Sequence, residues 1–465
     1  MFALLRIPKK RQGMSQTLRY DRPINPQKFP FYYGWMLVIS ATFCMAAAVP
    51  GSPPGVSPFV EPMLEAYGIS RPDFSLAYTL GTLLTGFVTA FLGQRLDRLD
   101  IRKVLIVIYA LLGFSLIGMG VFDRIYRQLP LAMQTPAVAW CFLFFSFFLI
   151  RFTGMGISST LCRSMVSRWF SERRSIAVTI TSAVLSLSFN GAPAILFLVV
   201  DGFGWRSAWI GMGLVLGILL VANVYVFFRK SPEECHMQVE NKAPEQNEAR
   251  TTIQIGSEKH FPVYKDLTAS KAMRTLTFWS VLFGISLNAF FGTGSSFHLA
   301  SICIDAGLDK ARAPQMLLVM GVINLAGTLI WGAISHRIDL KYALYATYLA
   351  IGLSIIGMLQ IEHLYGQLLF SIGSGASWGT FGILLNLPWP RYYGRSYLGD
   401  INARVTAFVI CTSAIGPYIF GLNRESTGDY ATALLGCLLA VPIGLVLAAL
   451  SHNPQERYNE RAKGS

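Results

Sequence analysis

The chain is dominated by apolar stretches, each about as long as the roughly 20 residues that a helix needs to cross a lipid bilayer. Twelve such stretches can be placed on the sequence, near 33–57, 75–95, 104–122, 137–160, 176–200, 207–228, 278–300, 313–335, 342–360, 366–390, 404–422 and 430–450. Inside a bilayer no water is present to bond the backbone, so such segments fold as helices. We therefore predict an all-α membrane protein with twelve transmembrane helices.

Composition excludes an ordinary soluble protein. Of the 465 residues, 53% are hydrophobic and only 14% are charged, whereas soluble proteins carry about 25% charged residues. In a soluble protein the net charge of +14 would indicate nucleic acid, but here the basic residues cluster in short connectors between apolar stretches. That placement is typical of membrane topology. We therefore expect a lipid bilayer, and no nucleic acid, as the partner of this surface.

One long polar segment, between the sixth and seventh apolar stretches, divides the chain into two sets of six. With both termini in the cytoplasm, 31 Lys and Arg residues fall on the inner side and 7 on the outer side, as the positive-inside rule requires. The predicted organisation is a cytoplasmic N-terminal tail (1–32), an N-terminal six-helix bundle (33–228), a cytoplasmic linker (229–277), a C-terminal six-helix bundle (278–450) and a cytoplasmic C-terminal tail (451–465).

The two sets of six echo each other in three places. The motif Gly93, Arg98, Asp100 and Arg102 returns in order as Gly332, Arg337, Asp339 and Lys341. Before the fifth stretch the chain reads Arg-Trp-Phe (168–170), and before the eleventh it reads Arg-Tyr-Tyr (391–393). Pro193 and Pro417 form the third pair. The order and placement of these echoes predict two related bundles, the parallel-repeat architecture of one group of transporters.

These residues resemble the major facilitator superfamily, whose loop after the second helix reads G-x-x-x-D-R followed by basic residues. Asp100 stands where the family usually has Gly, and Asp339 repeats that departure. The resemblance implies two bundles that rock against each other, with the loops as a cytoplasmic latch; the alternative is that their charges only set topology. Our candidates for this conformational gate are Gly93, Asp97, Arg98, Arg102, Gly332, His336 and Arg337.

Four further stretches are similar to the monocarboxylate-transporter-like branch, which also includes oxalate/formate antiporter-like proteins: FYYGWMLV, GVSPFVEPML, YGISRPDFSLAYTL and SRWFSERRSIAV. This resemblance implies transport of a small organic acid, often with a proton. The branch usually carries an Asp and an Arg four residues apart on the eighth helix. Here those positions hold Asn324 and Thr328, so the usual proton carrier and substrate cation are missing there.

Arg151 is a basic residue well inside an apolar stretch, in FFSFFLIRFTGMG. A charge at that depth costs at least about 2.5–3.5 kcal/mol, so we expect it to face a cavity or a partner. Two interpretations remain open. Arg151 binds an anionic substrate, for which a guanidinium is well suited, or it caps backbone carbonyls, as a partial fit to the family's fourth-helix Arg motif implies.

The other candidates for substrate binding are polar or aromatic side chains at membrane depth: Asn190, His298, Asn324, Trp378 and Asn386. His298 either couples protons, since its reference pKa is near 6.5, or is a hydrogen-bonded interfacial residue. The run VPGSPPGVSP in the first stretch predicts a helix that is kinked or broken near Pro50. The GxxxG runs 213–217 and 375–379 predict close helix packing.

The sequence carries no P-loop, no metal-ligand cluster and no catalytic motif, so we predict no enzyme activity, no cofactor and no metal. The favoured function is secondary active transport of a small organic solute, an organic anion such as a monocarboxylate, with or without a proton. The alternatives are a transporter-like solute sensor and a facilitator of a neutral solute without proton coupling. We expect a monomer in a bacterial inner membrane.

Overall fold

The computed structural model describes residues 23–96, 100–170, 174–229, 232, 235, 237, 263–309, 311–335, 337–394 and 396–456. These residues form helices and connecting loops, and no strand occurs among them. Eleven helices within the described residues are long and apolar enough to cross a membrane. The helix at the second predicted stretch, α4 (Arg71–Leu96), has 26 residues, which at 1.5 Å per residue is also sufficient. The all-α membrane fold is confirmed.

The N-terminal half (N-half) holds the first six predicted spans. Its elements are η2 (Pro26–Lys28), α1 (Gly34–Ala46), η3 (Val49–Gly51), α2 (Pro53–Val56), η4 (Ser57–Phe59), α3 (Val60–Tyr67), α4, α5 (Ile101–Gln128), η5 (Leu131–Met133), α6 (Pro136–Arg151), η6 (Phe152–Gly156), α7 (Ile157–Trp169), α8 (Arg174–Phe203) and α9 (Trp205–Phe227). Here η6 is a turn of π-helix that joins α6 to α7.

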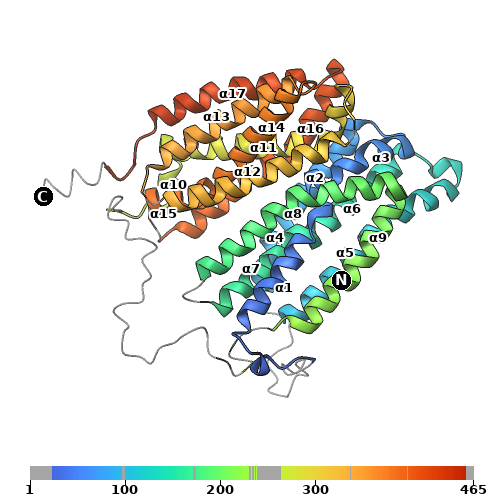
Figure 1. The fold of residues 1–465 in the computed structure, drawn as a ribbon, viewed down its shortest axis with the longest axis horizontal. Helices are drawn as coiled ribbons and strands as arrows, with labels where there is room; N and C mark the ends of the chain where they lie inside the picture. The colour runs from blue at the N-terminus through green and yellow to red at the C-terminus, as the bar shows by residue number, and fades with distance from the viewer. Residues whose placement is uncertain are drawn as a thin grey trace, which may run out of the picture.

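The C-terminal half (C-half) holds the last six. Its elements are α10 (Ala269–Ala272), α11 (Leu276–Asp305), α12 (Arg312–Ile334), α13 (Leu340–Leu359), α14 (Leu364–Asn386), α15 (Pro388–Tyr393), α16 (Leu398–Thr427) and α17 (Ala431–Leu450). Figure 1 shows the two halves as separate bundles lying side by side, one blue to green and the other yellow to red.

The first span is broken, as its proline run predicts. Helix α1 ends at Ala46, and four short segments from Val49 to Tyr67 replace a continuous helix. Pro lacks an N–H and cannot continue the helical ladder. Ser52 compensates locally, because its hydroxyl donates to the Val49 carbonyl (2.7 Å) and accepts from the Gly55 N–H (3.2 Å). The predicted single span 33–57 is therefore several segments that turn at membrane depth.

Helix contacts repeat between the halves. In the N-half α5 packs on α9 and α4 on α6; in the C-half α13 packs on α17 and α12 on α14. Across the halves α4 packs on α16, and α8 packs on α12. In the two halves the second span is equivalent to the eighth, and the fifth is equivalent to the eleventh. One contact joins the second span to the eleventh, and the other joins the fifth to the eighth, so the two contacts are equivalent to each other. The arrangement is what two related bundles facing each other produce.

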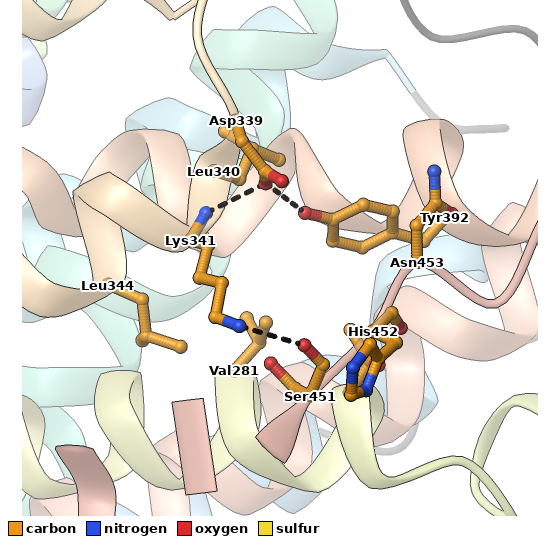
Figure 2. A pocket seen from close by; sticks show the side chains of 10 residues that line it. Val281, Asp339, Leu340, Lys341, Leu344, Tyr392, Ser451, His452 and Asn453 are labelled. Carbon is orange, nitrogen blue, oxygen red and sulfur yellow. Dashed lines mark hydrogen bonds between the residues drawn. The ribbon is translucent and has the colours of Figure 1, made fainter. Parts of the chain in front are cut away.

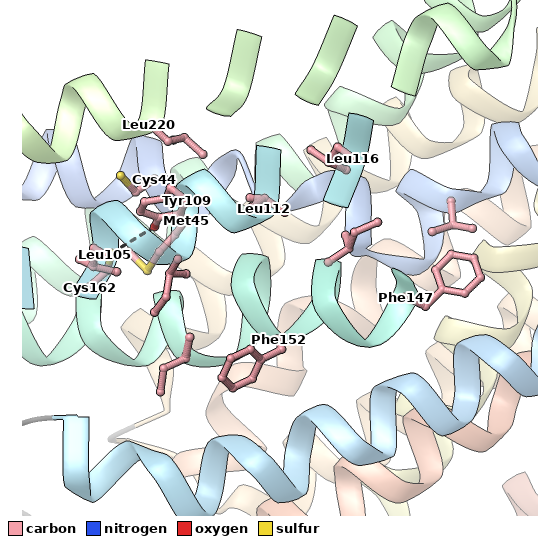
Figure 3. Close-up of a cluster of buried hydrophobic side chains, with 14 of the residues drawn as sticks. Cys44, Met45, Leu105, Tyr109, Leu112, Leu116, Phe147, Phe152, Cys162 and Leu220 are labelled. Carbon is pink, nitrogen blue, oxygen red and sulfur yellow. Dashed lines mark hydrogen bonds between the residues drawn. The ribbon is translucent and has the colours of Figure 1, made fainter. Parts of the chain in front are cut away.

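Each half buries its own hydrophobic core. One cluster draws on residues 33–235 together with Phe297 of the C-half, and the other draws on residues 267–448. In the N-half core, Tyr109 on α5 lies with Cys44 and Cys162 between α1 and α7 (Figure 3), and its hydroxyl is 3.7 Å from the Cys162 sulfur. All seven cysteines are free. Five of them are buried, whereas Cys141 and Cys411 are exposed.

The two ends of the molecule differ in the chain segments that they carry. The end that we call the linker end holds the start of α5 and the end of α9, where the chain leaves the N-half, together with residues 263–267, where it enters the C-half. The opposite end, which we call the far end, holds α3, the start of α4 and the end of α11. In Figure 1 the two bundles lie close together at the end that carries α2 and α3.

Candidate functional site

Arg151 lies at the end of α6, and its guanidinium reaches the break in the first span. Its Nη1 donates to the Gly51 carbonyl (2.8 Å) and to the Tyr78 hydroxyl (2.6 Å). Tyr78 in turn donates to the same carbonyl at 3.1 Å, and the guanidinium carbon lies 5.1 Å from the centre of the Tyr78 ring. The predicted carbonyl-capping contact of Arg151 is therefore present.

The broken helix explains why this carbonyl accepts from a side chain. In an α-helix the Gly51 carbonyl would accept from the N–H four residues later, which is that of Gly55. Here the Gly55 N–H bonds to the Ser52 hydroxyl instead. The Gly51 carbonyl is thus left for Arg151 and Tyr78. Three local features of the sequence, the prolines, Ser52 and Arg151, together build this contact.

The opposite edge of the guanidinium is uncommitted. Nε of Arg151 is buried and has no hydrogen-bond partner among the described residues, and Nη2 has none there either. The Nε–Nη2 edge presents two parallel N–H groups, a geometry that matches the two oxygens of a carboxylate. The groups that Nη1 contacts are neutral: a carbonyl, a hydroxyl and, at 3.8 Å, the Met155 sulfur.

A turn of π-helix follows Arg151 directly. In η6 the Ile157 N–H bonds to the Phe152 carbonyl, five residues back, where an α-helix would bond four residues back. Two small residues, Gly154 and Gly156, lie in this turn. A Cβ at Gly156 would come within 2.6 Å of the Thr89 hydroxyl oxygen on α4. Single π turns occur frequently at functional sites.

Asn190 and Asn324 lie on the two helices that pack across the halves, α8 and α12. Asn190 is buried, donates to the Ser186 carbonyl (2.8 Å) and lies against Gly321, where an added Cβ would be 2.7 Å from the Asn190 Cβ. Asn324 accepts from Thr328, one turn away, at 3.3 Å. The two positions that depart from the monocarboxylate-transporter-like pattern therefore bond to each other. A role in substrate binding remains a prediction for both asparagines.

His298 is fully buried at the interface between the halves. Its Nε2 lies 2.8 Å from the Pro417 carbonyl on α16, so this nitrogen is the donor, and it lies 3.5 Å from the Ser75 hydroxyl on α4. Nδ1 is buried and has no partner among the described residues. His298 is thus hydrogen-bonded and lies between the halves, and both interpretations of this residue, proton coupling included, remain predictions.

Trp378 and Asn386 both lie on α14 but in different surroundings. Trp378 packs against Phe381 and against Gly292 of α11, where a Cβ would be 2.8 Å from the indole. Asn386 is exposed near the end of α14 and donates to the Gly382 carbonyl (2.7 Å). The structure thus does not bring either residue into contact with Arg151.

In the N-half, the predicted gate is described only in part. Gly93 lies in α4 near its end, whereas Asp97 and Arg98 lie outside the described residues. Asp100 caps the start of α5 by accepting from the Arg102 N–H at 3.1 Å. Arg102 is buried and donates to the Tyr225 carbonyl at the end of α9. This bond of Arg102 stays within the N-half.

The C-half copy repeats this arrangement, as Figure 2 shows. Asp339 caps α13 through the Lys341 N–H (3.0 Å), and the Lys341 ammonium reaches the Ala449 carbonyl at the end of α17 (2.7 Å). Tyr392 donates to Asp339 at 3.1 Å. A small cavity lies between Lys341, Tyr392 and His452. Gly332 lies in α12, Arg337 is exposed, and His336 lies outside the described residues. A gating role for these residues remains a prediction.

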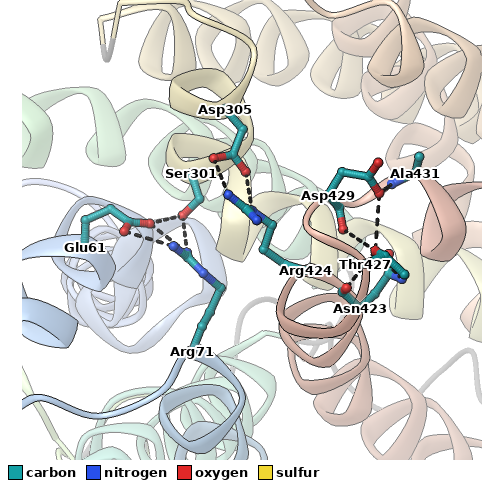
Figure 4. Close-up of polar contacts among 9 residues, drawn as sticks. All are labelled: Glu61, Arg71, Ser301, Asp305, Asn423, Arg424, Thr427, Asp429 and Ala431. Atoms are coloured by element: carbon teal, nitrogen blue, oxygen red, sulfur yellow. Dashed lines mark hydrogen bonds and ion pairs between the residues drawn. The ribbon is translucent and has the colours of Figure 1, made fainter.

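The far end carries a polar cluster that the sequence did not predict (Figure 4). Arg71 forms a two-pronged ion pair with Glu61, with N–O distances of 2.7 and 3.0 Å, and donates to Ser301 of the C-half at 2.6 Å. The Ser301 hydroxyl donates to Glu61. Beside them Arg424 pairs with Asp305 at 2.7 Å within the C-half. The cluster of Glu61, Arg71 and Ser301, which we call the far-end clasp, therefore joins the two halves.

Glu61 lies on α3, outside the membrane-spanning segments. Burial by itself raises the pKa of a carboxyl group, but the hydrogen bonds and charge of Arg71, with the bond from Ser301, outweigh burial and hold the pKa of Glu61 below its usual value. Glu61 is therefore ionised at neutral pH in the closed clasp. This contact could not be predicted from the sequence, because Glu61 and Arg71 are ten positions apart and form no recognisable pattern near the ends of the apolar stretches.

No group of three or more His, Cys, Asp or Glu side chains that could hold a metal occurs among the described residues. The candidate site is the Arg151 guanidinium, which among the described residues is hydrogen-bonded through Nη1 alone. It lies beside the break in the first span, at a depth where the two six-helix bundles meet. That architecture defines the class: a multi-pass membrane transporter built from two repeats.

The chain belongs to the Major Facilitator Superfamily, which residues 35–417 match. Monocarboxylate transporter 12 of Homo sapiens is 24% identical over 317 residues, which cover 63% of this chain and 60% of that protein. The match thus spans less than two thirds of the human relative. The MFS-type transporter YcxA of Bacillus subtilis is 22% identical over 86% of this chain and 91% of its own length. The resemblance to the monocarboxylate transporters is confirmed.

The fold also matches a solved structure. A bacterial homologue of the human lysosomal transporter Spinster, in an inward-facing and unoccupied conformation, superposes with a TM-score of 0.62. The match covers 90% of this chain and 95% of the homologue, at 14% sequence identity. It supports the twelve-helix fold. Family and fold are those of membrane transporters and not of enzymes.

Proposed function

We propose that the protein is a secondary transporter that moves a small organic anion, such as a monocarboxylate, by alternating access. The observation that carries this proposal is the Nε–Nη2 edge of Arg151 at membrane depth, which has no hydrogen-bond partner within the described part of the chain. Holding a cation there is costly unless something compensates for its charge. The described partners of Nη1 are neutral, and a carboxylate on the open edge supplies the missing charge.

The contacts between the halves support alternating access. Arg71 reaches Ser301 at the far end, the Ala300 N–H lies 3.4 Å from the Ser57 hydroxyl, and further along α4 Thr79 donates to the Ala414 carbonyl (2.7 Å). Such hydrogen bonds are individually modest, so they can hold in one state and break in another. With the termini in the cytoplasm, as the charge bias predicts, the far end faces outside and the closed side is the outer one.

The experiment is uptake by proteoliposomes of radiolabelled lactate and of its uncharged amide, lactamide, with and without a pH gradient. We expect wild-type protein to take up lactate in preference to lactamide. Arg151→Gln is expected to reduce lactate uptake about tenfold or more, because it removes charge-assisted hydrogen bonds to the carboxylate. Arg151→Lys should retain part of the uptake, since it keeps the charge but loses the two-pronged geometry.

The matched control is Arg312→Gln, which removes a positive charge from an exposed position at the start of α12 and is expected to leave uptake unchanged. Thermal unfolding of each variant separates loss of function from loss of fold. Undiminished lactate uptake by Arg151→Gln contradicts the proposed anion site. Lactate binding without uptake favours the solute sensor, and equal uptake of lactamide favours a facilitator of neutral solutes. Dependence on the pH gradient reports proton coupling.

A further inference from the structure

Three elements connect the Arg151 site to the far-end clasp, although Arg151 itself lies on α6. Helix α4 supplies Tyr78 to the site and Arg71 to the clasp, about two turns apart. The broken segment of the first span supplies Gly51 to the site and Glu61 to the clasp. The third element, α11, supplies Ser301 to the clasp, and one turn earlier it supplies Phe297. Any movement of α11 at the clasp therefore reaches the neighbourhood of the site.

Tyr78 contacts both Arg151 of the N-half and Phe297 of the C-half. It is 1% exposed, and its hydroxyl accepts from Arg151 while donating to the Gly51 carbonyl. Its ring packs against Phe147 in the same half, with ring centres 5.3 Å apart, and against Phe297 of the C-half, 4.8 Å apart. One side chain thus fixes the guanidinium with its polar end and contacts the opposite half with its apolar face.

The contacts of the Phe297 side chain depend on the position of the N-half. It is carried by α11, yet it is fully buried in the hydrophobic core of the N-half, where it also packs on Phe74. Separation of the halves at the far end would withdraw this ring from that core. The Tyr78 ring would then lose a neighbour that holds this side chain, and with it the hydroxyl, in position against Arg151. The affinity of the Arg151 edge for a carboxylate would therefore differ between the two states, which is the requirement for coupling.

We propose that Tyr78 is a positioning residue that couples the anion site to the far end: its hydroxyl orients Arg151 for a carboxylate, and its ring seats Phe297 of the opposite half. This inference rests on the proposed function for the anion, but the Phe297 contact is independent of what is transported. The two roles use different atoms of Tyr78, so two substitutions separate them. Tyr78→Phe removes the hydroxyl and keeps the ring, and Phe297→Leu removes the facing ring and keeps the hydroxyl.

The first measurement is equilibrium binding of radiolabelled lactate to purified protein. Tyr78→Phe is expected to weaken binding about tenfold, because a hydrogen bond to a charged group is lost at the site. Phe297→Leu is expected to weaken lactate binding less, by about threefold, since it leaves the hydroxyl and the guanidinium in place but removes the ring that packs on Tyr78. The control is Tyr109→Phe, which removes another buried hydroxyl from the N-half core and should leave binding unchanged.

The second measurement is the far-end distance between spin labels on Glu65→Cys and Ser426→Cys, which are exposed positions on opposite halves. Exposed Cys141 and Cys411 are first replaced by Ala. In the otherwise wild-type protein saturating lactate is expected to shift this distance distribution. In Tyr78→Phe and in Phe297→Leu the shift should be lost at lactate concentrations that saturate each variant. Phe297→Leu should also broaden the distribution without lactate.

The outcomes separate the two proposals. If the spin-labelled wild-type protein does not bind lactate, the proposed anion site is wrong, whereas the lactate-free distance in Phe297→Leu still tests the contact between the halves. If lactate binds and the shift persists in both saturated variants, Tyr78 does not couple the sites. Wild-type lactate affinity in Tyr78→Phe would likewise overturn its role in orienting Arg151.

Discussion

Glu61 is the residue whose charge holds the far-end clasp together. Its two carboxylate oxygens both engage Arg71, and the Ser301 hydroxyl of the other half bonds to one of them. Unfolding separates Glu61 from Arg71 and Ser301 and returns its pKa to the usual value of 4.5. The pKa is therefore lower in the folded protein than in the unfolded one, so proton binding favours unfolding.

This difference predicts a dependence on acid. The contribution of Glu61 to the free energy of unfolding is complete above the usual value of 4.5 and is lost as the pH falls through the lowered pKa of the folded protein. The thermal unfolding temperature should thus carry no Glu61-dependent change from about pH 7 to about pH 5 and should fall below the usual carboxyl pKa. Glu61→Gln should lack this acid step and should unfold at a lower temperature than wild type at neutral pH.

A matched control is Glu362→Gln, which neutralises a far-end carboxylate whose side chain is 65% exposed and pairs only with the adjacent His363 among the described residues. It should retain the acid step. A step that survives in Glu61→Gln would assign the titration to another group. The charged and titratable neighbours of the clasp are Arg71 on α4, His298 and Asp305 on α11, and Tyr430 before α17.

At this scale the sequence identified some site residues and missed others for definite reasons. Arg151 could be predicted because a cation inside an apolar stretch is costly and needs an explanation. Tyr78 could not, since a tyrosine in an apolar helix is ordinary, and the Gly51 carbonyl belongs to the backbone. Glu61 and Arg71 lie near helix ends, where charges are common, and only the fold brings Ser301 beside them.

At the scale of helices, glycine pairs set how closely the spans approach. In α12 and α14 the chains meet at Gly327 and Gly379, where a Cβ on Gly379 would lie 2.9 Å from the Gly327 Cα. Gly213 and Gly217 of α9 approach Gly113 of α5 in the same way. The close packing predicted from both GxxxG runs is present, because small residues allow backbones to touch.

Gly379→Val is therefore expected to destabilise the C-half by about 1–3 kcal/mol or more, since the added carbons meet backbone that cannot move aside. The measurement is thermal unfolding of the detergent-solubilised protein. Gly436→Val on α17 is the control, because a Cβ there meets nothing within 4 Å. Equal unfolding temperatures for the two variants would show that the α12–α14 contact tolerates expansion.

The helices themselves were largely predictable, and their interruptions less so. Apolar stretches of the right length indicated twelve spans, and the proline run indicated the break after Ala46. Nothing in the stretch 137–160 indicated the π turn at Phe152–Gly156. Hydrophobic length is the same for a continuous helix and for one with an extra residue in a turn, so only the backbone hydrogen bonds reveal the difference.

At the scale of the whole molecule the two halves are repeats, and the repeat extends to individual bonds. Asp100 and Asp339 each cap the third helix of their half, and Arg102 and Lys341 each reach the end of the last one. The sequence echoes predicted the relation between the halves. They did not predict that these bonds lie within each half. A motif that occurs in both halves is equally compatible with bonds inside one half and with bonds between the two halves.

Restraining the far end should stop transport if the halves must separate there. Ser57 of the N-half and Ala300 of the C-half are buried and adjacent, with the Ser57 hydroxyl 3.4 Å from the Ala300 nitrogen. Oxidation of the double variant Ser57→Cys with Ala300→Cys is expected to abolish lactate uptake, and a reductant should restore it. Each single variant serves as the control. Full uptake by completely cross-linked protein would rule out opening at this end.

The π turn beside Arg151 has a geometric consequence. An α-helix advances about 100° per residue, so the extra residue in η6 sets the face of α6 that carries Arg151 out of phase with the faces of α7 below it. Removing one residue from Phe152–Gly156 would rotate α6, and Arg151 with it, by about that angle relative to α7. The direction in which the Arg151 guanidinium points therefore depends on one extra residue in η6, and a single insertion or deletion in this turn would change it.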